Sequence, residues 1–585
     1  MGIRSELHRR QTKKQRMVRN CIAFFTVYVA FQIAFSPCAK AQNTVGTTFY
    51  SEDVAPGYVL FAPSGSTRTF LIDRCGQLIN EWISEERPGL SCYLLDNGDL
   101  LRTRKVLSGA FVGGGVGGMI ERYDWDGNLI WSDTLASAEL HQHHDLAYLP
   151  NGNILTILWE KHTAEEAIER GRRPELTPEE VWVTRIVELA PLPTNGSEIV
   201  WSWSPWEHLI QDTDSLLENF GDPADHPTRF DVNFEAVAEI FGPGIGQSEA
   251  FDWLHVNSID YDEERDEIVL SSRNWSEIWV IDHSTTMEEA HSNVGGQHGI
   301  GGDILWRWGN PAAYGVGDEA DKQLFGQHDA QFIDLESGKG ISVFNNGLQR
   351  PDGEYSTIHQ IELPLDEDGH YIDVEDGQFL PPFPIWTFPE EPDLDFYSAK
   401  ISGYDWIDGS HHLVCEGMQG HFFEVDQYGN ELWEYFNPMT STGPLNQGDN
   451  PIQNSVFRAK YVAPGHPGLA GRDLTPSAPL ELFPDLSFCP EDLDITEESG
   501  TPLSIKTWPN PAKDLVHIEI PAIHPDASEL IVYNAQGQEQ ARAAVSQLIT
   551  LKVQNWPSGI YLGIINDSRT SSQTSPLPPI KIIIK

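Results

Sequence analysis

The stretch Gly127-Asn128-Leu129-Ile130-Trp131 decides the fold, because its pattern recurs along the chain. Each copy has a turn with Gly, Asp or Asn, followed by a short apolar strand that ends in Trp. Six copies are present, the one at Trp386 weakly, and they end at Trp82, Trp131, Trp201, Trp306, Trp386 and Trp433. The closest copies are about 40–50 residues apart, the length of one four-stranded propeller blade. The repeat therefore predicts a six-bladed β-propeller.

Between the Trp copies lie short β-rich runs with Asn-Gly turns, such as residues 95–101 and 149–155. Such runs are typical of hairpins. A β-sandwich would also contain hairpins, but it does not require a Trp in the same local context at each repeat. Two insertions, Lys161 to Val181 and Pro205 to Ala250, break the β rhythm and are predicted to be partly helical. The predicted fold class is all-β, a six-bladed propeller with partly helical insertions.

The two ends of the chain differ from this core. Residues 1–41 combine a basic stretch, an apolar run from Ile22 to Phe35 and the small-residue pattern Ala39-Lys40-Ala41, which predicts a signal peptide. The apolar run is short for a membrane anchor of about 20 residues, and no later segment predicts a permanent membrane span. We expect the propeller over residues 42–495, a linker over 496–504, and a small β-sandwich over 505–585.

The formal net charge of −49 excludes a nucleic-acid partner, because the long-range field repels polyanions. An anionic ligand must then be held by a few local Arg, Lys or His side chains. Four cysteines remain after the leader, and export permits disulfides. Cys75 and Cys92 flank a predicted strand, turn and strand, so we expect them to pair. No cysteine spacing resembles a zinc site.

Histidines occur at the start of an apolar strand in consecutive blades. They lie in His143-His144-Asp145, His255-Val256-Asn257 and His328-Asp329-Ala330. The innermost strand of each propeller blade lines the channel, so residues at one register of these strands converge. A single histidine at a strand start is usually a structural hydrogen-bonder, but coincidence in three blades favours one shared site.

Arg273 ends the apolar strand that follows His255. It is either a solvated strand end or an anion-binding fork, because guanidinium presents paired planar donors to oxyanions.

Neutral imidazole is a competent nucleophile near pH 7, and neighbouring cationic groups can neutralise charge on a transferred group. This interpretation needs no cofactor and no metal. The rival interpretation is a three-histidine zinc site. Under either, Asp145 and Asp329 are placed to orient their neighbours.

The chain resembles the bacterial arylsulfate sulfotransferase family over about residues 49–473. The resemblance rests on three ordered sets of residues: Trp253-Leu254-His255-Val256-Asn257-Ser258-Ile259 with Ser271-Ser272-Arg273; Trp306-Arg307-Trp308-Gly309 followed by Gln327-His328; and Phe423-Glu424-Val425 through Trp433-Glu434-Tyr435.

This resemblance implies transfer of a sulfuryl group from an aryl sulfate to a phenolic acceptor without a nucleotide donor. By position, it implies that His328 carries the sulfuryl group covalently. It further implies that His255, Arg273 and either His144 or His143 bind the sulfate oxygens, with the choice between the last two open. No oligomeric state follows from the sequence.

The C-terminal part resembles the sorting domain of type IX secretion substrates. Its motifs are Thr507-Trp508-Pro509-Asn510-Pro511-Ala512, Val532-Tyr533-Asn534 with Gly537, and Trp556-Pro557-Ser558-Gly559-Ile560-Tyr561. The resemblance implies recognition by the type IX secretion machinery. It also implies export through the periplasm of a Gram-negative, Bacteroidetes-type bacterium to the cell surface or medium, with removal of this domain.

Two alternatives stay beside the sulfotransferase hypothesis. A surface propeller could bind sulfated ligands without turnover, because a propeller fold does not by itself imply catalysis. A metal-dependent hydrolase could use the same histidines.

Overall fold

The structure is a computed structural model. It describes residues 43–235, 251–372, 377–487 and 489, and, in the C-terminal part, residues 506–508, 512–519, 527–534, 538–544, 548–567 and 580–584. The described residues form two compact units that divide after residue 495. The predicted signal peptide (1–41) and linker (496–504) lie outside the described residues.

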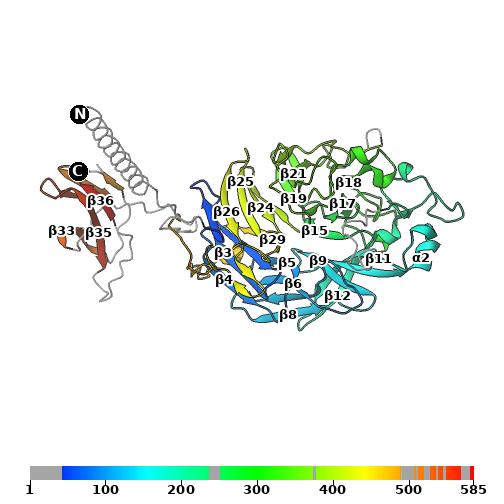
Figure 1. Cartoon of the computed structure of the whole chain (residues 1–585), viewed down its shortest axis with the longest axis horizontal. Helices are drawn as coiled ribbons and strands as arrows, with labels where there is room; N and C mark the ends of the chain where they lie inside the picture. The colour runs from blue at the N-terminus through cyan, green and yellow to red at the C-terminus, as the bar shows by residue number, and fades with distance from the viewer. Residues whose placement is uncertain are drawn as a thin grey trace, which may run out of the picture. The chain divides into compact units, whose positions relative to one another are not determined.

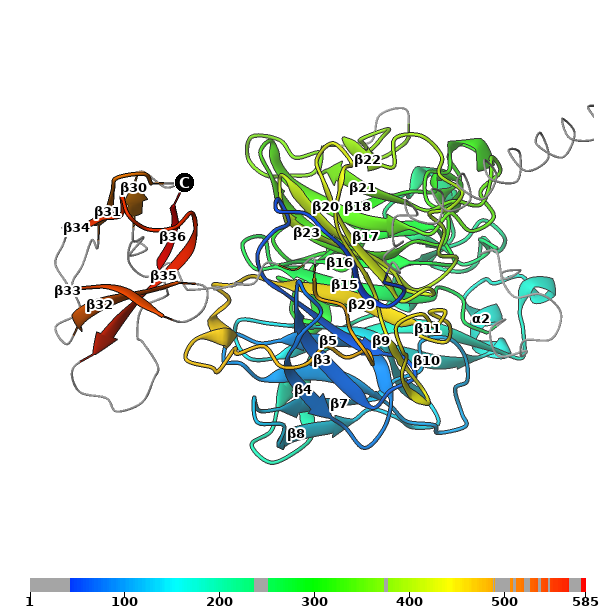
Figure 2. The same ribbon diagram turned by 60° about the vertical axis from the view of Figure 1, so that its left-hand side comes forward.

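The N-terminal unit is a six-bladed β-propeller, as the Trp repeat predicted (Figure 1). Both views show the innermost strands, such as β9, β15 and β29, near the middle of this unit (Figures 1 and 2). In ring order, the innermost strands are β29 (Val456–Val462), β5 (Pro88–Leu94), β9 (Leu140–Tyr148), β15 (Val256–Asp262), β19 (His328–Leu335) and β23 (Gly403–Asp408).

The other strands complete each blade outward in the same ring order. The second strands are β2 (Tyr58–Pro63), β6 (Leu100–Lys105), β10 (Ile154–Thr163), β16 (Glu267–Ser272), β20 (Gly338–Asn345) and β24 (His411–Glu416). The third are β3 (Arg68–Asp73), β7 (Gly118–Tyr123), β11 (Glu180–Pro191), β17 (Glu277–Asp282), β21 (Thr357–Glu362) and β25 (His421–Asp426). The fourth are β4 (Leu78–Ile83), β8 (Leu129–Thr134), β12 (Ser197–Trp203), β18 (Trp306–Trp308), β22 (Trp386–Phe388) and β26 (Glu431–Phe436).

Segments far apart in the sequence close the ring. Strand β29, the last propeller strand, pairs with β2 near the start of the unit, and β1 (Gly46–Tyr50) pairs with β26. A disulfide joins Cys75 to Cys489, while Cys92 and Cys415 are free and buried. The prediction that Cys75 pairs with Cys92 is therefore wrong. Cys75 lies in the outer β3–β4 turn of one blade and Cys92 in the innermost strand of the next, so the hairpin expected between them does not exist.

The repeated Trp residues link neighbouring blades. Each lies in the fourth strand of its blade, and its indole N–H donates to the connection between the third and fourth strands of the next blade. The acceptors are Asp124 O for Trp82, Gly196 O for Trp131, Thr285 Oγ1 for Trp201, Leu380 O for Trp306, Gln427 O for Trp386 and Arg74 O for Trp433. The sixth bond returns to the first blade. Each Trp thus packs apolar ring surface while its N–H is satisfied, which explains its recurrence.

The two insertions are only partly helical, as expected. The first, between β10 and β11, holds helix α2 (Ala164–Glu169), which begins with a capping box of Thr163 and Glu166, and the single turn η1 (Pro174–Leu176). The described part of the second holds η2 (Pro205–Glu207), η3 (Pro223–Asp225) and the parallel pair β13 (Leu209–Ile210) and β14 (Phe230–Asp231). Other short elements are α3 (Met287–Ala290), η5 (Pro311–Tyr314), η6 (Glu319–Asp321), β27 (Met439–Thr440), β28 (Gly443–Pro444) and η7 (Pro467–Leu469).

The C-terminal unit contains two sheets. One consists of β30 (Lys506–Trp508), β31 (Leu515–Glu519) and β34 (Leu548–Lys552); the other of β33 (Glu539–Ala544), β32 (Ala527–Asn534), β35 (Gly559–Asp567) and β36 (Ile580–Ile584). Buried residues of both sheets, including Val516, Ile518, Leu530, Val532 and Ile549, form one core. Apolar side chains shared between two sheet faces are the hallmark of a small sandwich.

Candidate active site

Three inner strands present the predicted histidines through irregular backbone. The pairing of β9 with β10, β15 with β16 and β19 with β20 shifts register beside His144, His255 and His328, respectively. His144 and His255 have φ of 52° and 49°, and Asp329, next to His328, has φ of 60°. Non-glycine residues rarely adopt such angles, and bulges commonly re-aim side chains at active sites. At these positions the irregular backbone orients the histidine side chains instead of continuing the regular pairing of the sheet.

These residues converge as the sequence predicted. The ring centroids of His144 and His255 are 4.7 Å apart. The ring of Phe457, from β29, lies 6.0 Å from His144 and 6.5 Å from His328. Arg273 is buried beside them, and its amide donates to the carbonyl of His255. Four predicted site residues, from blades that are consecutive in the ring, therefore share one end of the channel.

The partners of His328 define which ring nitrogen carries the proton. The Nδ2 of Asn346 donates to the carbonyls of Ser398 and Ile401 at 2.7 and 2.8 Å. This turns the amide oxygen of Asn346 toward His328 Nδ1 at 2.7 Å. An amide oxygen can only accept, so Nδ1 is protonated and Nε2 carries the lone pair. The geometry thus supplies a neutral imidazole whose Nε2 is unprotonated.

Ile401 approaches the His328 ring with strained backbone. Its N–H donates to His328 Nε2 at 3.2 Å, and its carbonyl accepts from Asn346. Its φ is 54° and that of Ser402 is 95°. A β-branched residue in the left-handed region is a genuine outlier, and such outliers cluster at functional sites. This strained backbone holds the Ile401 N–H against His328 Nε2.

A short chain of contacts links His255 to Arg273. Asp252 accepts from His255 at Nδ1, at 2.6 Å, so Nε2 of that ring is left for a ligand. The carbonyl of Asp252 accepts from Asn274 Nδ2 at 2.7 Å, and Asn274 Oδ1 accepts from the Arg273 guanidinium at 3.3 Å. Two neighbouring connections, one before β15 and one after β16, therefore orient a carboxylate-bound imidazole and a guanidinium, which together suit an anionic ligand.

Of the two adjacent histidines, it is His144 that faces the other site residues. His143 stacks on Trp159, with centroids 4.1 Å apart and an 8° interplanar angle. The two Nδ1 atoms are 2.8 Å apart, so one ring donates to the other. His143 therefore supports His144 from behind.

A glycine-rich loop covers His144. Gly115 has φ of +88°, and a Cβ there would lie 1.9 Å from His144 Cε1; a Cβ at Gly114 would lie 3.9 Å from His255 Cε1. Any side chain at Gly115 would displace the imidazole, so glycine is required for close backbone approach as well as for the left-handed conformation.

Burial is the main reason why these imidazoles are neutral. Burial lowers the pKa of His328 well below its ordinary value, and the positive charges of Arg273 and Arg458 act in the same direction. Burial likewise holds the pKa of His144 well below that range, helped by the neighbouring His255 and His143. Desolvation disfavours the charged form of a histidine. Both rings are therefore neutral at neutral pH.

Sequence reasoning missed Asn346, Asp252, Asn274 and Ile401. Asp252 could have been noticed three residues before His255, but Asn346 and Ile401 belong to other strands or connections and act through tertiary contacts. Asp145 and Asp329 do not bond the histidines beside them; both form ion pairs with Arg458, at 2.6 and 3.0 Å.

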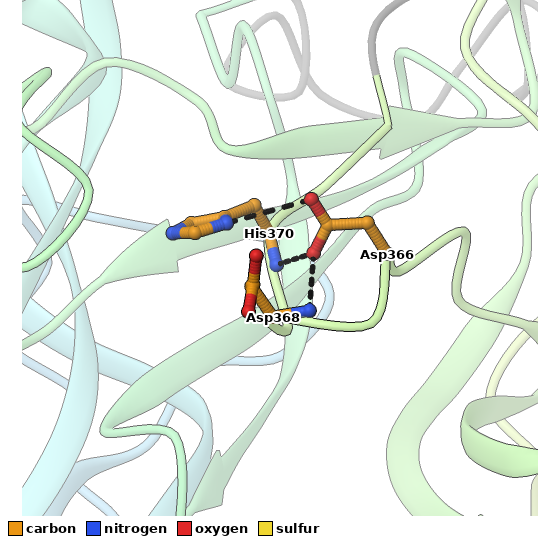
Figure 3. Close-up of side chains that lie close together, drawn as sticks. All are labelled: Asp366, Asp368 and His370. Carbon is orange, nitrogen blue, oxygen red and sulfur yellow. Dashed lines mark hydrogen bonds and ion pairs between the residues drawn. The ribbon is translucent and has the colours of Figure 1, made fainter.

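In the part of the chain that the structure describes, the channel histidines do not form a group of three whose ligand atoms all lie within 4.8 Å of one another, so the rival zinc interpretation has no support there. Among the described residues, one group of three His, Cys, Asp or Glu has ligand atoms all within 4.8 Å of one another, and it is Asp366, Asp368 and His370, away from the channel histidines (Figure 3). This group is exposed. Asp366 Oδ1 accepts from the backbone N–H groups of Asp368 and His370 at 2.9 Å, which is the internal bonding of a turn.

Comparison with known proteins assigns the chain to a protein family. Residues 52–440 match the family described as Arylsulfotransferase (ASST). The chain belongs to the arylsulfotransferase family. Among curated proteins, it is similar to arylsulfate sulfotransferase AssT of Escherichia coli O6:H1 (strain CFT073), with 24% identity over 192 residues. That match covers 32% of this chain and 31% of AssT, so the chain spans about a third of that relative's length.

Solved structures resemble the unit only distantly. A protein of unknown function from Bacteroides caccae has a TM-score of 0.35 and 12% identity, covering 70% of this chain and 99% of its own. The periplasmic gluconolactonase PpgL of Pseudomonas aeruginosa has a TM-score of 0.33 and 10% identity, covering 70% of this chain and 99% of its own.

The C-terminal unit has a separate match. Residues 506–584 match the secretion system C-terminal sorting domain. This type IX domain implies export to the medium or the cell surface. In the part of the chain that the structure describes, no helix has the length and apolar character needed to cross a membrane.

Proposed function

We propose that this protein is a secreted sulfotransferase that moves a sulfuryl group from an aryl sulfate ester to a phenolic acceptor through a covalent intermediate on His328, without a nucleotide donor. The observation that carries the proposal is the Asn346–His328 contact, which leaves the lone pair on Nε2 beside a buried guanidinium. Family membership supports aryl sulfotransfer, and the site geometry supports the histidine route.

The first half-reaction forms one bond and breaks one. His328 Nε2 attacks sulfur, the bond from sulfur to the aryl oxygen breaks, and the phenolate departs with the electron pair. His255, Arg273 and His144 surround the sulfuryl oxygens and offset their charge, the electrostatic term that usually dominates such catalysis. The Ile401 N–H is placed to donate to one of these oxygens once Nε2 is bonded to sulfur.

The second half-reaction is the reverse with a different phenol. The acceptor phenol gives up its proton through solvent to the departed phenolate, its oxygen attacks sulfur, the sulfur–nitrogen bond breaks, and neutral His328 is restored. A covalent intermediate divides one difficult transfer into two easier ones. No change of oxidation state and no nucleotide is required by this sequence.

We also propose the processing that this function needs. The leader covers residues 1–41, the propeller 42–495, the linker 496–504 and the sorting domain 505–585. The type IX secretion machinery would recognise and remove the last part. The N- and C-terminal residues of the protein recovered from the medium, determined by mass spectrometry, test these boundaries.

The decisive experiment follows release of a chromogenic aryl alcohol from its sulfate ester, with and without phenol, and weighs the denatured protein by mass spectrometry without exposing it to acid, which would cleave the sulfur–nitrogen bond. We expect continued release only with phenol and, without phenol, release of one equivalent together with a protein heavier by one sulfuryl group. His328→Ala should abolish both. His359→Ala is the matched control, because His359 is a buried histidine of the same blade, whose pKa burial lowers to about 3. Full activity of His328→Ala would refute the nucleophile, and tight sulfate-ester binding without release or adduct would favour a binding propeller.

A further inference from the structure

Arg458 lies where the three histidine-bearing strands meet. It is buried in β29, directly after Phe457, whose ring contacts His144 and His328. One guanidinium nitrogen donates to Asp145 at 2.6 Å, a second donates to the carbonyl of Asn257 at 3.1 Å, and Nε forms an ion pair with Asp329 at 3.0 Å. One side chain thus contacts β9, β15 and β19.

Each of these contacts is adjacent to a site histidine. Asp145 follows His144, Asp329 follows His328, and Asn257 is two residues after His255. The contacts fall at the register shifts described above, where the backbone hydrogen bonding of each strand to its own blade is interrupted. A guanidinium suits this place because its planar donors point in several fixed directions.

The same network reaches two more inner strands. Arg458 donates to Tyr93 of β5 at 3.1 Å, and Asp329 accepts from the amide of Tyr404 in β23 at 3.0 Å. Tyr93 in turn donates to Asp145 at 2.7 Å. All six inner strands are therefore joined beneath the histidines, through one residue of the strand that closes the ring.

Because Arg458 belongs to the strand that closes the ring, its contacts depend on ring closure. Strand β29 lies beyond residues 52–440, the part that matches the family, and it pairs with β2 to close the propeller. Before β29 is in place, the carboxylates of Asp145 and Asp329 have no guanidinium between them. The site and the closed ring therefore form together.

We propose that Arg458 is a positioning residue that holds the His144, His255 and His328 strands in catalytic register, so that the site is complete only when β29 has closed the ring. The proposal rests on the proposed function for its activity measurement, but its structural measurement does not. It predicts effects of Arg458 substitutions that a purely structural buried ion pair would not produce.

Two substitutions separate the effect of the Arg458 charge from the effect of its hydrogen-bonding geometry. Arg458→Gln removes both the charge and the guanidinium donors and leaves two carboxylates beneath the site. Arg458→Lys keeps the charge but loses the planar donors that point in several directions. The charged and titratable groups around His328 are Arg273, His255, His144 and Arg458. Loss of the Arg458 charge, with Asp145 and Asp329 left unpaired, favours protonated His328, so the acid limb of the pH–rate profile should move toward neutral pH.

A buried ion pair in a blade provides the matched control. Arg307 is fully buried, bonds Glu277 through Nε at 2.9 Å, and donates to two backbone carbonyls. Arg307→Gln and Arg307→Lys remove a comparable pair from the fourth strand of its blade, away from the channel. They should lower thermal stability without moving the pH profile.

The experiment compares all four variants with the wild-type protein by thermal unfolding, by the pH dependence of kcat/KM and by histidine NMR titration without substrate. We expect Arg458→Gln to lower kcat at least 100-fold and raise the titration midpoints of His144 and His328, and Arg458→Lys to lower kcat about 10-fold with the acid limb unchanged. If Arg458→Gln fails to fold, Arg458→Lys decides the geometric part.

Wild-type kcat in Arg458→Lys, or a folded Arg458→Gln whose titrations and pH profile match those of Arg307→Gln, would overturn the proposal. A wild-type protein that transfers no sulfuryl group would instead refute the proposed function. The NMR titration would still decide the role of Arg458.

Discussion

Histidines in two regions of the propeller differ in charge, since two in the channel are neutral and two in the blades are protonated. The channel histidines, His144 and His328, are buried among imidazoles and guanidinium groups, and their pKa values lie well below the ordinary range. The blade histidines, His283 and His421, also lie largely buried, but each sits between two carboxylates. Burial opposes their charged form, yet hydrogen bonds to these carboxylates outweigh it and raise the pKa of each to about 9.

The difference shows that partner type, more than burial, decides what a histidine does here. His283 contacts Asp266 and Glu188 at 2.7 and 3.2 Å, and is therefore a fixed cation that ties two blades together. His328 contacts an amide oxygen, which holds one proton without adding charge. A carboxylate favours imidazolium, whereas a neutral acceptor in a buried site keeps the imidazole neutral.

Among the substitutions that test this comparison, the largest expected effect comes from breaking the contact between His255 and the Asp252 carboxylate. Asp252→Asn would present an amide N–H to His255 Nδ1 and force the opposite tautomer, so we expect transfer to fall about 10²–10⁴-fold, the scale seen when a catalytic imidazole is turned to the wrong tautomer. Steady-state kinetics would measure the fall.

Asp303→Asn is the control for that substitution. Asp303 holds buried His208 at Nδ1, at 2.8 Å, away from the channel. It should lower stability and leave transfer near the wild-type rate. Equal kinetic losses in both variants would mean that Asp252 acts through folding alone.

A smaller loss is expected from moving one channel histidine without changing any charge. In Gly115→Ala, the new methyl group would occupy the place of the His144 ring, so we expect transfer to fall about 10–100-fold, as displacements of about 1 Å can do. Gly127→Ala has a similar φ of +84° and no atom within 4 Å of its Cβ. Both variants should lose about 1 kcal/mol of stability from backbone strain, but only the first should lose activity.

The smallest effect concerns stability and the blade histidines. Because the pKa of His283 rises from an ordinary 6.5 to about 9 on folding, its contribution is fully present below pH 6.5 and is lost as the pH rises through 9. It is at most on the order of 3 kcal/mol. In His283→Gln, the melting temperature should be lower than wild type at pH 6 and equal to it above pH 9. A difference that grows with pH would contradict the assignment of His283 as a cation.

The channel histidines should affect stability on the other side of neutrality. Their pKa values are lowered on folding, so the unfolded chain binds more protons below pH 6.5 and the folded state loses stability as the pH falls. His144→Phe should therefore lessen the decline of the melting temperature between pH 6.5 and 5. An unchanged decline would show that other groups, such as the buried carboxylates, control acid unfolding.

Local sequence patterns were enough to predict the fold of the propeller. The Trp recurrence predicted six blades because each Trp must meet the same neighbour in the next blade, and a repeated local need leaves a repeated local signal. The histidines at strand starts predicted a shared channel site for the same reason, since equivalent registers of inner strands converge. The choice of His144 over His143 could not be made, because a bulge decides which of two adjacent rings faces inward.

Long-range partners were beyond the sequence. Cys75 bonds a cysteine from the far end of the unit, and the nearer Cys92 lies in another blade's inner strand. No sequence motif identifies Asn346 or Ile401, because any Asn side chain or backbone amide could make the same hydrogen bonds to His328 if the fold placed it nearby. Arg458 is the extreme case, since its contacts with Asp145 and Asp329 exist only once the ring is closed.

The sequence by itself determined the blade number, the acidic surface, the sorting unit and which residue types could perform group transfer. Those features follow from composition and from spacing between residues that are near one another in the chain. Tertiary structure alone decided the proton positions on the imidazoles, the disulfide and the contacts of Arg458. Each depends on what the folded chain places within hydrogen-bonding distance, and at such distances a neutral or charged partner determines whether a buried histidine is neutral or a cation.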